Sequence, residues 1–304
     1  MTNFRVTILG CGSAVPTIYH KPPSQIIEVG NKVFMIDCGE GTQIQMRKFR
    51  TKIGRLDAIF ISHLHGDHIF GLPGLITTLS LLGRTADLNI YANKDLEILI
   101  SSLTDYLGKN LTFKVNIIPL NPESCEVIFE NKSIKVSSFP LKHRIETNGF
   151  LIEEKQQPKK IIKEMIDYYD IPVKMIKSIK DGEDFVTADG TVVDNKHLTT
   201  PSKAPRKYAY CSDTAYEPNI IKYIKGADFV YHEATFAESE SERATSTMHS
   251  TASQAASIAK QAGVKRLVIG HYSSRYNELG VLLKEAQEVF PNTELASEGK
   301  VFDL

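Results

Sequence analysis

The stretch SHLHGDHIFG, residues 62–71, decides how the rest of this chain is interpreted. Three of the nine histidines, His63, His65 and His68, stand within six positions, and Asp67 precedes the last of them. Directly before the cluster, the apolar run LDAIFIS is typical of a buried strand. The cluster is therefore predicted on the loop that leaves the carboxyl end of a strand, where open α/β sheets place their sites.

The residue types of this cluster point to metal binding. Imidazole nitrogens and carboxylate oxygens are standard ligands of zinc and similar divalent metals. His63 and His65 can reach one point from an extended loop, while Gly66 permits a sharp turn that directs Asp67 and His68 to a second point. A single metal would not need all four side chains, so the spacing favours two metals, with further ligands from elsewhere.

Three other polar residues follow apolar runs at the same position, just past the end of a predicted strand. His143 follows SIKVSSFPLK, Asp213 follows KYAYCS, and His271 follows KRLVIG. Each of them alone is compatible with a structural role. Together they repeat one position in the strand-to-loop register, as expected when several strand ends converge on one site.

A second pair of residues is a candidate for acid/base chemistry. Glu233 follows the strand-like run DFVY, and His249 precedes Thr251 and Gln254, which form a capping box for the next helix. A glutamate that orients a histidine is a common catalytic arrangement, so Glu233 and His249 are predicted to act together. The alternative is that Glu233 only satisfies local hydrogen bonds.

Composition places the chain among ordinary globular proteins. It has 304 residues, and 42% of them are hydrophobic. Lys plus Arg and Asp plus Glu both number 36, so net charge gives no attraction to nucleic acid. The apolar runs are shorter than the roughly 20 residues of a membrane-spanning helix, and no signal peptide is evident, which favours a cytoplasmic protein with no membrane partner.

The four cysteines are far apart and form no C-x-x-C pair, which argues against a disulfide framework and against a thiolate zinc site. They are predicted to be small buried side chains, and they are Cys11, Cys38, Cys125 and Cys211. The glycines at 10 and 12 do not begin a dinucleotide-binding motif, because the third glycine of G-x-G-x-x-G would fall on Val15.

The order of apolar patterns predicts an α/β fold. Short runs rich in Val, Ile and Phe dominate the first half, and strands alternate with helices in the second half. In the first half, strands are expected at 4–10, 32–37, 57–63, 88–93, 113–120, 125–130, 133–140 and 149–154, and a helix at 94–108. In the second half, strands are expected at 206–213, 228–234, 265–271 and 300–304, and helices at 217–226, 251–263 and 277–290.

Residues 153–206 interrupt this alternation and are interpreted as an inserted arm within a single domain of residues 1–304. The segment is rich in Lys and contains several prolines. A short helix is expected in PKKIIKEMIDYY, and a hairpin around Asp189 and Gly190. Long insertions in compact domains tend to be functional arms or lids.

The ordered motifs of the chain resemble those of the metallo-β-lactamase superfamily and, within it, the short form of the ribonuclease Z family. The resemblance runs from residue 4 to near the carboxyl terminus. The motifs that carry it are GCGSAVPT (10–17), DCGEGTQ (37–43), SHLHGDHIFGLPGL (62–75), LKHRIETNGF (141–150), CSDT (211–214), HEAT (232–235), HST (249–251) and GHYSSRY (270–276).

The resemblance implies a four-layer αβ/βα sandwich and a site with two zinc ions. One zinc ion would be held by His63, His65 and His143, and the other by Asp67, His68 and His271, with Asp213 bridging them. Asp67 would also help to deprotonate or orient the attacking water. His249, supported by Glu233, would protonate the leaving 3′ oxygen.

The activity that the resemblance implies is endonucleolytic removal of the 3′ trailer from precursor tRNA, leaving a 3′ hydroxyl. The family also implies a homodimer in which one subunit's arm holds the tRNA that the other cleaves. A small-molecule phosphodiesterase or arylsulfatase on the same metal site is the alternative enzyme. A third hypothesis is a metal-bound RNA-binding or scaffold protein without catalysis, which the presence of both Glu233 and His249 disfavours.

Overall fold

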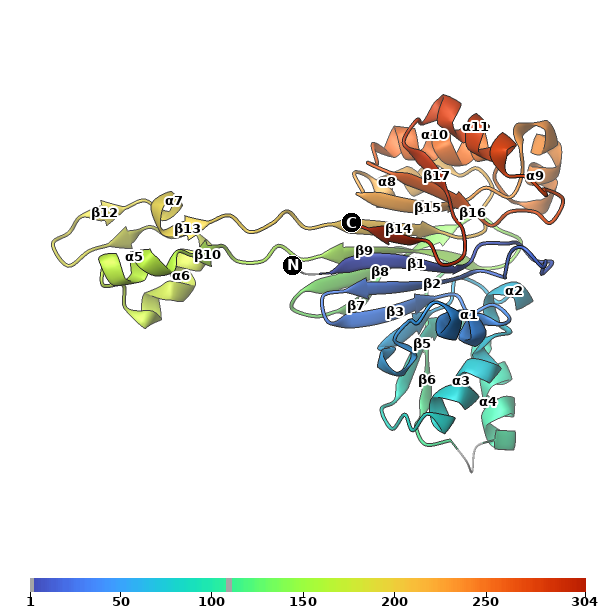
Figure 1. Cartoon of the computed structure of the whole chain (residues 1–304), viewed down its shortest axis with the longest axis horizontal. Coiled ribbons are helices and arrows are strands. Elements are labelled where there is room, and N and C mark those ends of the chain that lie inside the picture. Colours follow the sequence, from blue (N-terminus) through green and yellow to red (C-terminus); the bar gives the residue numbers. More distant parts are fainter. Residues whose placement is uncertain (1–2, 108–110) are drawn as a thin grey trace. The chain divides into compact units, whose positions relative to one another are not determined.

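The computed structural model describes residues 3–107 and 111–304, which form two compact units. Unit 1 combines the chain up to residue 153 with residues 206–304, and unit 2 comprises residues 154–205. Unit 1 contains two seven-stranded sheets with helices on their outer faces (Figure 1). The described helices are too short, or not apolar enough, to cross a membrane.

The first sheet has the strand order β18-β1-β2-β3-β4-β5-β6. From β3 to β6 neighbouring strands are parallel, so their carboxyl ends lie at one edge of the sheet. The strands of this sheet are β1 (Phe4–Gly10), β2 (Ser24–Val29), β3 (Lys32–Ile36), β4 (Ala58–Phe60), β5 (Leu88–Ala92), β6 (Val115–Pro119) and β18 (Val301–Asp303).

The second sheet has the strand order β17-β16-β15-β14-β9-β8-β7. From β14 to β17 neighbouring strands are parallel, and β9 pairs with β14 in the antiparallel direction. The strands of this sheet are β7 (Glu126–Glu130), β8 (Ile134–Leu141), β9 (Thr147–Glu154), β14 (Lys207–Cys211), β15 (Phe229–Glu233), β16 (Leu267–Gly270) and β17 (Thr293–Leu295).

The two sheets pack face to face through large apolar side chains. Phe34 and Phe60 of the first sheet belong to the same buried cluster as Phe150 and Tyr208 of the second. The rings of Phe60 and Phe150 lie 5.5 Å apart between centroids. Central strands are buried on both faces, as in β15, where all five residues are buried, because helices cover the side that does not face the other sheet.

Helices form the two outer layers of unit 1. On the first sheet, α1, α3 and α4 contribute Met46, Leu75 and Leu96 to a second buried cluster. On the second sheet, α10 presents a buried row of alanines, which lets the helix lie close to the strands. The helices are α1 (Thr42–Lys48), η1 (Ile53–Arg55), α2 (Gly66–Ile69), α3 (Leu72–Leu81), α4 (Leu96–Leu107), η4 (Pro218–Ile220), α8 (Ile221–Ile224), η5 (Glu238–Glu240), α9 (Ser241–Thr247), α10 (Ala252–Ala262) and α11 (Gly280–Val289).

Unit 2 is a small module with its own apolar cluster, which includes Ile179, Phe185 and Leu198. The buried Asn195 side chain holds it together, because its amide donates to the carbonyls of Ile179 and Glu183. The elements of unit 2 are β10 (Lys160–Ile161), α5 (Lys163–Tyr168), η3 (Val173–Met175), α6 (Ile176–Asp181), β11 (Phe185–Val186), β12 (Val192–Val193), α7 (Asn195–Leu198) and β13 (Thr199–Thr200).

The predicted α/β class and the four-layer arrangement are confirmed, and so is the capping box of Thr251 and Gln254. Several elements were not predicted, among them β2, α1, α3, α9 and β17. Lys160–Ile161, expected in a helix, is a strand that pairs with β13. The prediction of four buried cysteines was wrong for Cys125, which is exposed because it lies in the turn before the edge strand β7.

Candidate active site

The predicted site residues lie together at the carboxyl ends of strands from both sheets. The loop after β4 supplies His63, His65, Asp67 and His68, and α2 begins within it. From the second sheet, His143 follows β8, Asp213 follows β14, Glu233 ends β15 and His271 follows β16. His249 lies between α9 and α10. Six of the nine predicted residues line a pocket of about 610 Å³: His65, Asp67, His143, Asp213, His249 and His271. The other three, His63, His68 and Glu233, lie behind them within reach of their polar atoms.

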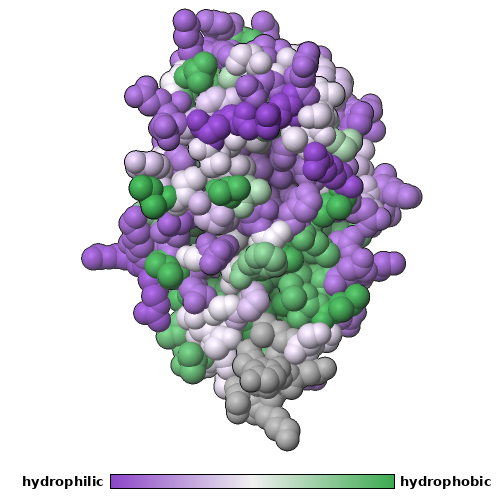
Figure 2. Space-filling view, turned by 90° about the vertical axis from the view of Figure 1, so that its right-hand side faces the viewer, coloured by the Kyte–Doolittle hydropathy of each residue, from purple (hydrophilic) through white to green (hydrophobic). Residues whose placement is uncertain are grey.

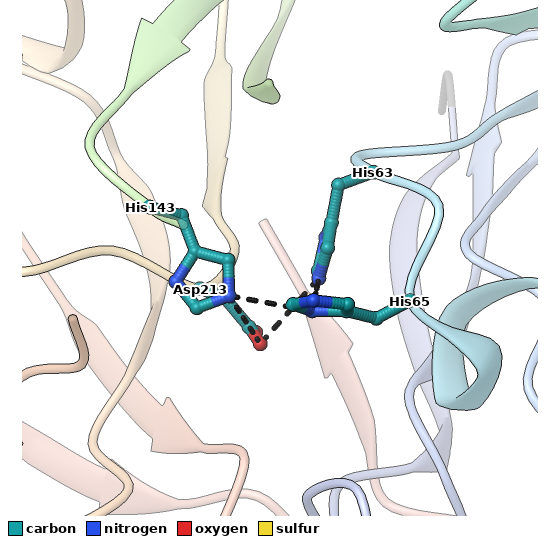
Figure 3. Close-up of side chains that lie close together, drawn as sticks. All are labelled: His63, His65, His143 and Asp213. Atoms are coloured by element: carbon teal, nitrogen blue, oxygen red, sulfur yellow. Dashed lines mark hydrogen bonds and ion pairs between the residues drawn. The ribbon is translucent and has the colours of Figure 1, made fainter. Parts of the chain in front are cut away.

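A first cluster joins His63, His65, His143 and Asp213 (Figure 3). The distance from His63 Nε2 to His65 Nδ1 is 2.9 Å, and that from His143 Nε2 to His65 Nδ1 is 3.3 Å. Asp213 Oδ2 lies 3.6 Å from His63 Nε2 and 3.9 Å from His143 Nε2. Ligand atoms around a tetrahedral zinc are separated by roughly 3.3 Å, since zinc–nitrogen bonds are about 2.0 Å long. The cluster therefore fits one metal ion.

A second cluster joins Asp67, His68 and His271, and Asp213 reaches it with its other oxygen. Asp67 Oδ2 lies 3.3 Å from His68 Nε2 and 3.6 Å from His271 Nε2. Asp213 Oδ1 lies 3.1 Å from His271 Nε2 and 3.6 Å from His68 Nε2. Asp213 thus faces both clusters, one oxygen to each.

Hydrogen bonding tests whether these side chains are suited to hold metal. Four buried atoms of the second cluster have no hydrogen-bond partner, although buried polar atoms almost always have one. They are Asp67 Oδ2, His68 Nε2, Asp213 Oδ1 and His271 Nε2. These atoms point at one another, so a cation between them would satisfy all four. The donor set, imidazole with carboxylate, suits zinc.

Outer hydrogen bonds fix the orientation of most of these imidazoles. His143 Nδ1 donates to the Met248 carbonyl at 2.9 Å, and His271 Nδ1 lies 2.9 Å from the hydroxyl of Thr235. When Nδ1 is occupied in this way, Nε2 is presented to the site in the tautomer that binds metal. His271 adopts a left-handed φ of 62°, which directs its side chain back over the strand end.

Asp37 is a buried carboxylate beneath the site that was not among the predicted residues. It lies just past β3 and accepts hydrogen bonds from Ser62 N and Oγ, at 2.8 and 2.9 Å. It also accepts from His68 Nδ1 at 2.9 Å and from the Tyr210 hydroxyl at 2.7 Å. The signal was available, because Asp37 follows the apolar run KVFMI at the same strand-end position as Asp213.

Burial and nearby charge set the protonation of the site. Burial lowers the pKa of His63, His65 and His143, which keeps these rings neutral and able to bind metal. Burial alone would raise the pKa of Asp67, but His68 and His271 outweigh it and hold that pKa well below its usual range.

His249 has the opposite character. Its Nδ1 lies 3.0 Å from Glu233 Oε1 inside the protein. Burial would lower the pKa of His249, but the Glu233 carboxylate outweighs burial and raises it to about 9. Glu233 is itself fixed by the backbone N–H groups of Thr214, Thr235 and Ser250. The Glu233 carboxylate thus favours the protonated form of His249, which lies on the wall of the pocket and in that form can donate a proton.

The architecture and the site define the chain as a protein of the metallo-β-lactamase fold. The "metallo-beta-lactamase fold protein YhfI" of Bacillus subtilis, 19% identical, has a TM-score of 0.70 over 99% of this chain and 100% of its own, which shows the shared fold. A family model described as "Anti-Pycsar protein Apyc1" matches residues 4–162, slightly more than half of the chain, which places the chain in that family.

Full-length comparisons give a more specific family. The curated "Ribonuclease Z" of Parabacteroides distasonis is 52% identical over 299 residues, 98% of each chain. The crystal structure of human tRNase Z, short form, is 27% identical with a TM-score of 0.70 over 98% of each chain. The chain belongs to the ribonuclease Z family, as the motif resemblance implied.

The hydrogen bonds of Asp37 predict a large effect of Asp37→Asn on stability. Asparagine keeps the shape of the side chain, but it turns a donor toward Ser62, His68 or Tyr210 and removes the charge that faces His68 Nδ1. We expect the free energy of unfolding to fall by about 2–4 kcal/mol. Urea unfolding in the presence of a chelator measures this effect without a contribution from bound metal.

Asp57→Asn provides the matched control. Asp57 also accepts from a backbone N–H and a side chain, Val33 N and Lys32 Nζ, but 24% of its side chain is exposed. Its replacement is expected to cost about 1 kcal/mol or less. Equal effects of the two substitutions would contradict the central position given to Asp37.

Proposed function

We propose that this chain is a zinc-dependent endoribonuclease that removes the 3′ trailer from precursor tRNA and leaves a 3′ hydroxyl. The observation that carries the proposal is one pocket with two metal-ligand clusters, joined through Asp213 and adjoined by the protonated His249. Full-length similarity to ribonuclease Z supports precursor RNA as the substrate over a small phosphodiester. We propose that the reaction takes place in the cytoplasm, which is where bacteria, the source of that relative, make precursor tRNA.

The metal ligands are assigned by the two clusters. His63, His65 and His143 would hold one zinc ion, Asp67, His68 and His271 the other, and Asp213 would bridge. When bound, the two ions would activate water and neutralise the charge that builds up on the phosphate. Measurement of metal content in the purified protein tests this assignment, with two zinc ions per chain expected.

The side chains divide the remaining tasks. Asp67 is an ionised carboxylate on the pocket wall, so it can accept a hydrogen bond from the attacking water and orient it. Attack on phosphorus breaks the bond to the 3′ oxygen of the tRNA. His249 donates its proton to that oxygen. Before this transfer Glu233 stabilises the imidazolium, and after it the hydrogen bond to Glu233 keeps the imidazole in the same orientation. The products are a tRNA with a 3′ hydroxyl and a trailer with a 5′ phosphate.

Unit 2 is proposed to be the arm that holds tRNA, in a homodimer where each arm serves the other subunit's site. Its lysines include Lys159, Lys163, Lys174 and Lys177, and cations of this kind bind phosphates in a salt-dependent manner. Lys159 also donates to Asn195 Oδ1, so it contributes to the module itself.

Cleavage of precursor tRNA tests the proposed reaction. Purified protein is expected to cut a precursor tRNA with a 3′ trailer once, next to the last base before the trailer, and gel mapping of the products locates the cut. Chelator should abolish the cut, zinc should restore it, and Asp67→Ala should lower the rate by at least about 1,000-fold, because ligand and water are both affected. Hydrolysis of bis(p-nitrophenyl) phosphate without any cut in precursor tRNA would reject the proposed substrate.

Substitution of His249 tests proton donation to the leaving group. His249→Ala is expected to lower kcat on precursor tRNA by about 100- to 10,000-fold, because the 3′ alkoxide needs a proton to leave. Bis(p-nitrophenyl) phosphate has a leaving group that departs unprotonated, so its kcat should fall by less than about 10-fold. Rates of both substrates under saturating conditions give the comparison.

Glu233→Gln should also lower kcat on precursor tRNA more than kcat on bis(p-nitrophenyl) phosphate, but by a smaller factor than His249→Ala. Glu242→Gln, at an exposed position on α9, serves as its control. Equal losses on the two substrates would assign His249 to a role other than proton donation.

Removal of unit 2 tests its proposed role as the tRNA-binding arm. Glu153 and Lys207 are opposite each other on β9 and β14, so an Asn-Gly turn can replace residues 155–205 without moving either strand. The shortened chain is expected to unfold within about 5 °C of the full chain. Its kcat/KM on precursor tRNA should fall by at least about 100-fold, with bis(p-nitrophenyl) phosphate hydrolysis unchanged.

Light scattering on both chains reports the oligomeric state in the same experiment, and a monomeric full chain would refute the homodimer. Full cleavage of precursor tRNA by the shortened chain would exclude unit 2 as the tRNA-binding arm.

A further inference from the structure

Phe70 is an exposed aromatic side chain at the pocket. It follows α2, and 63% of it is exposed, whereas its neighbours Ile69 and Leu72 are buried in the apolar cluster beneath. It lines the same pocket as Asp67 and His249. Figure 2 views unit 1 from the side on which α2 lies in Figure 1, and apolar side chains gather below the centre of this mostly hydrophilic face. Phe70 therefore presents an aromatic surface to solvent beside the reacting groups.

The backbone holds the Phe70 ring in a defined place. A Cβ atom added at Gly66 would lie 2.3 Å from Phe70 Cε2, so the ring lies directly over that glycine. The Phe70 N–H donates to the Gly66 carbonyl at 2.9 Å, which closes the turn. Gly66 stands between His65 and Asp67, so the position of the ring is tied to that of the metal-ligand loop. A ring fixed in this way can bind a flat partner with little loss of entropy.

The other phenylalanine of the pocket is not available in the same way. Phe236 is only 5% exposed, and its ring lies edge-on to His249 at 6.1 Å between centroids. The Arg275 guanidinium covers it at 5.3 Å. Among the side chains that the structure describes at this pocket, Phe70 is therefore the one phenyl ring with a free face.

The direction of the reaction indicates which part of the substrate meets Phe70. In the proposed function, on which this inference rests, His249 protonates the 3′ oxygen of the tRNA. His249 comes from the half of unit 1 built on the second sheet, and Phe70 from the half built on the first. We propose that Phe70 is a substrate-positioning residue that stacks on the first nucleobase of the trailer, on the far side of the scissile phosphate from His249. Stacking accepts any base, which suits trailers of varied sequence.

A cycle of protein and substrate changes tests this stacking. The wild-type chain and Phe70→Ala are each assayed on precursor tRNA and on the same RNA with an abasic first trailer nucleotide. Phe70→Ala is expected to lower kcat/KM on the intact RNA by about 10- to 100-fold, and the abasic change should lower the wild-type value by a similar factor. On the abasic RNA, Phe70→Ala should have no further effect, since both changes remove the same contact.

Two further variants separate stacking from other effects. Phe70→Tyr should keep the activity, while Leu81→Ala, which removes an 83% exposed side chain on α3, should leave it unchanged. The proposal would be overturned if Phe70→Ala lowered kcat/KM on the abasic RNA as much as on the intact RNA. It would also be overturned if the effect of Phe70→Ala disappeared only when the last tRNA nucleotide, and not the first trailer nucleotide, was abasic. If the wild-type chain does not cut intact precursor tRNA at all, the proposed function fails. That result differs from additive losses of kcat/KM, which would reject the stacking alone.

Discussion

The Asp213 carboxylate is the point on which both halves of the molecule converge. It is buried, and each of its oxygens faces a different set of imidazoles, His63 and His143 on one side and His68 and His271 on the other. Burial alone would raise the pKa of Asp213, but the imidazoles of His271, His68 and His63 outweigh burial and hold that pKa well below its usual range. The charged form of Asp213 therefore depends on rings that come from both sheets and meet at the same place.

The strand ends make this meeting geometrically possible. Both sheets contain parallel strands whose carboxyl ends lie at one edge, and face-to-face packing sets these two edges side by side. Tyr210 on β14 donates a hydrogen bond from its hydroxyl to Asp37, which lies just after β3. This bond links the two sheets directly under the site. The same carboxylate orients His68, so packing of the sheets and orientation of a ligand depend on one side chain.

Sequence reasoning reached much of this arrangement because the informative residues follow a local rule. A polar residue directly after an apolar strand is visible in one dimension, and His143, Asp213 and His271 all obey this rule. Asp37 obeys it too, but its role depends on Ser62 and Tyr210, which come close only after folding. The exposure of Phe70 could not be predicted either, because an apolar run predicts burial for each of its residues. The helical turn places Ile69 on the buried side and Phe70 on the exposed side. The strand β2 was missed although Pro22 and Pro23 mark its start, because the run SQIIEV begins with two polar residues and its register comes from pairing with β1 and β3.

Glu233 connects His249 to the two clusters that share this pocket. It accepts the backbone N–H groups of Thr214 and Ser250, which flank Asp213 and His249, and the hydroxyl of Thr235. The Thr235 hydroxyl in turn lies 2.9 Å from His271 Nδ1. One buried carboxylate thus raises the pKa of His249 and, through Thr235, fixes a metal-ligand ring. Burial would raise the pKa of Glu233, but the neighbouring His249 outweighs burial and lowers that pKa, so each of the two groups stabilises the charged form of the other.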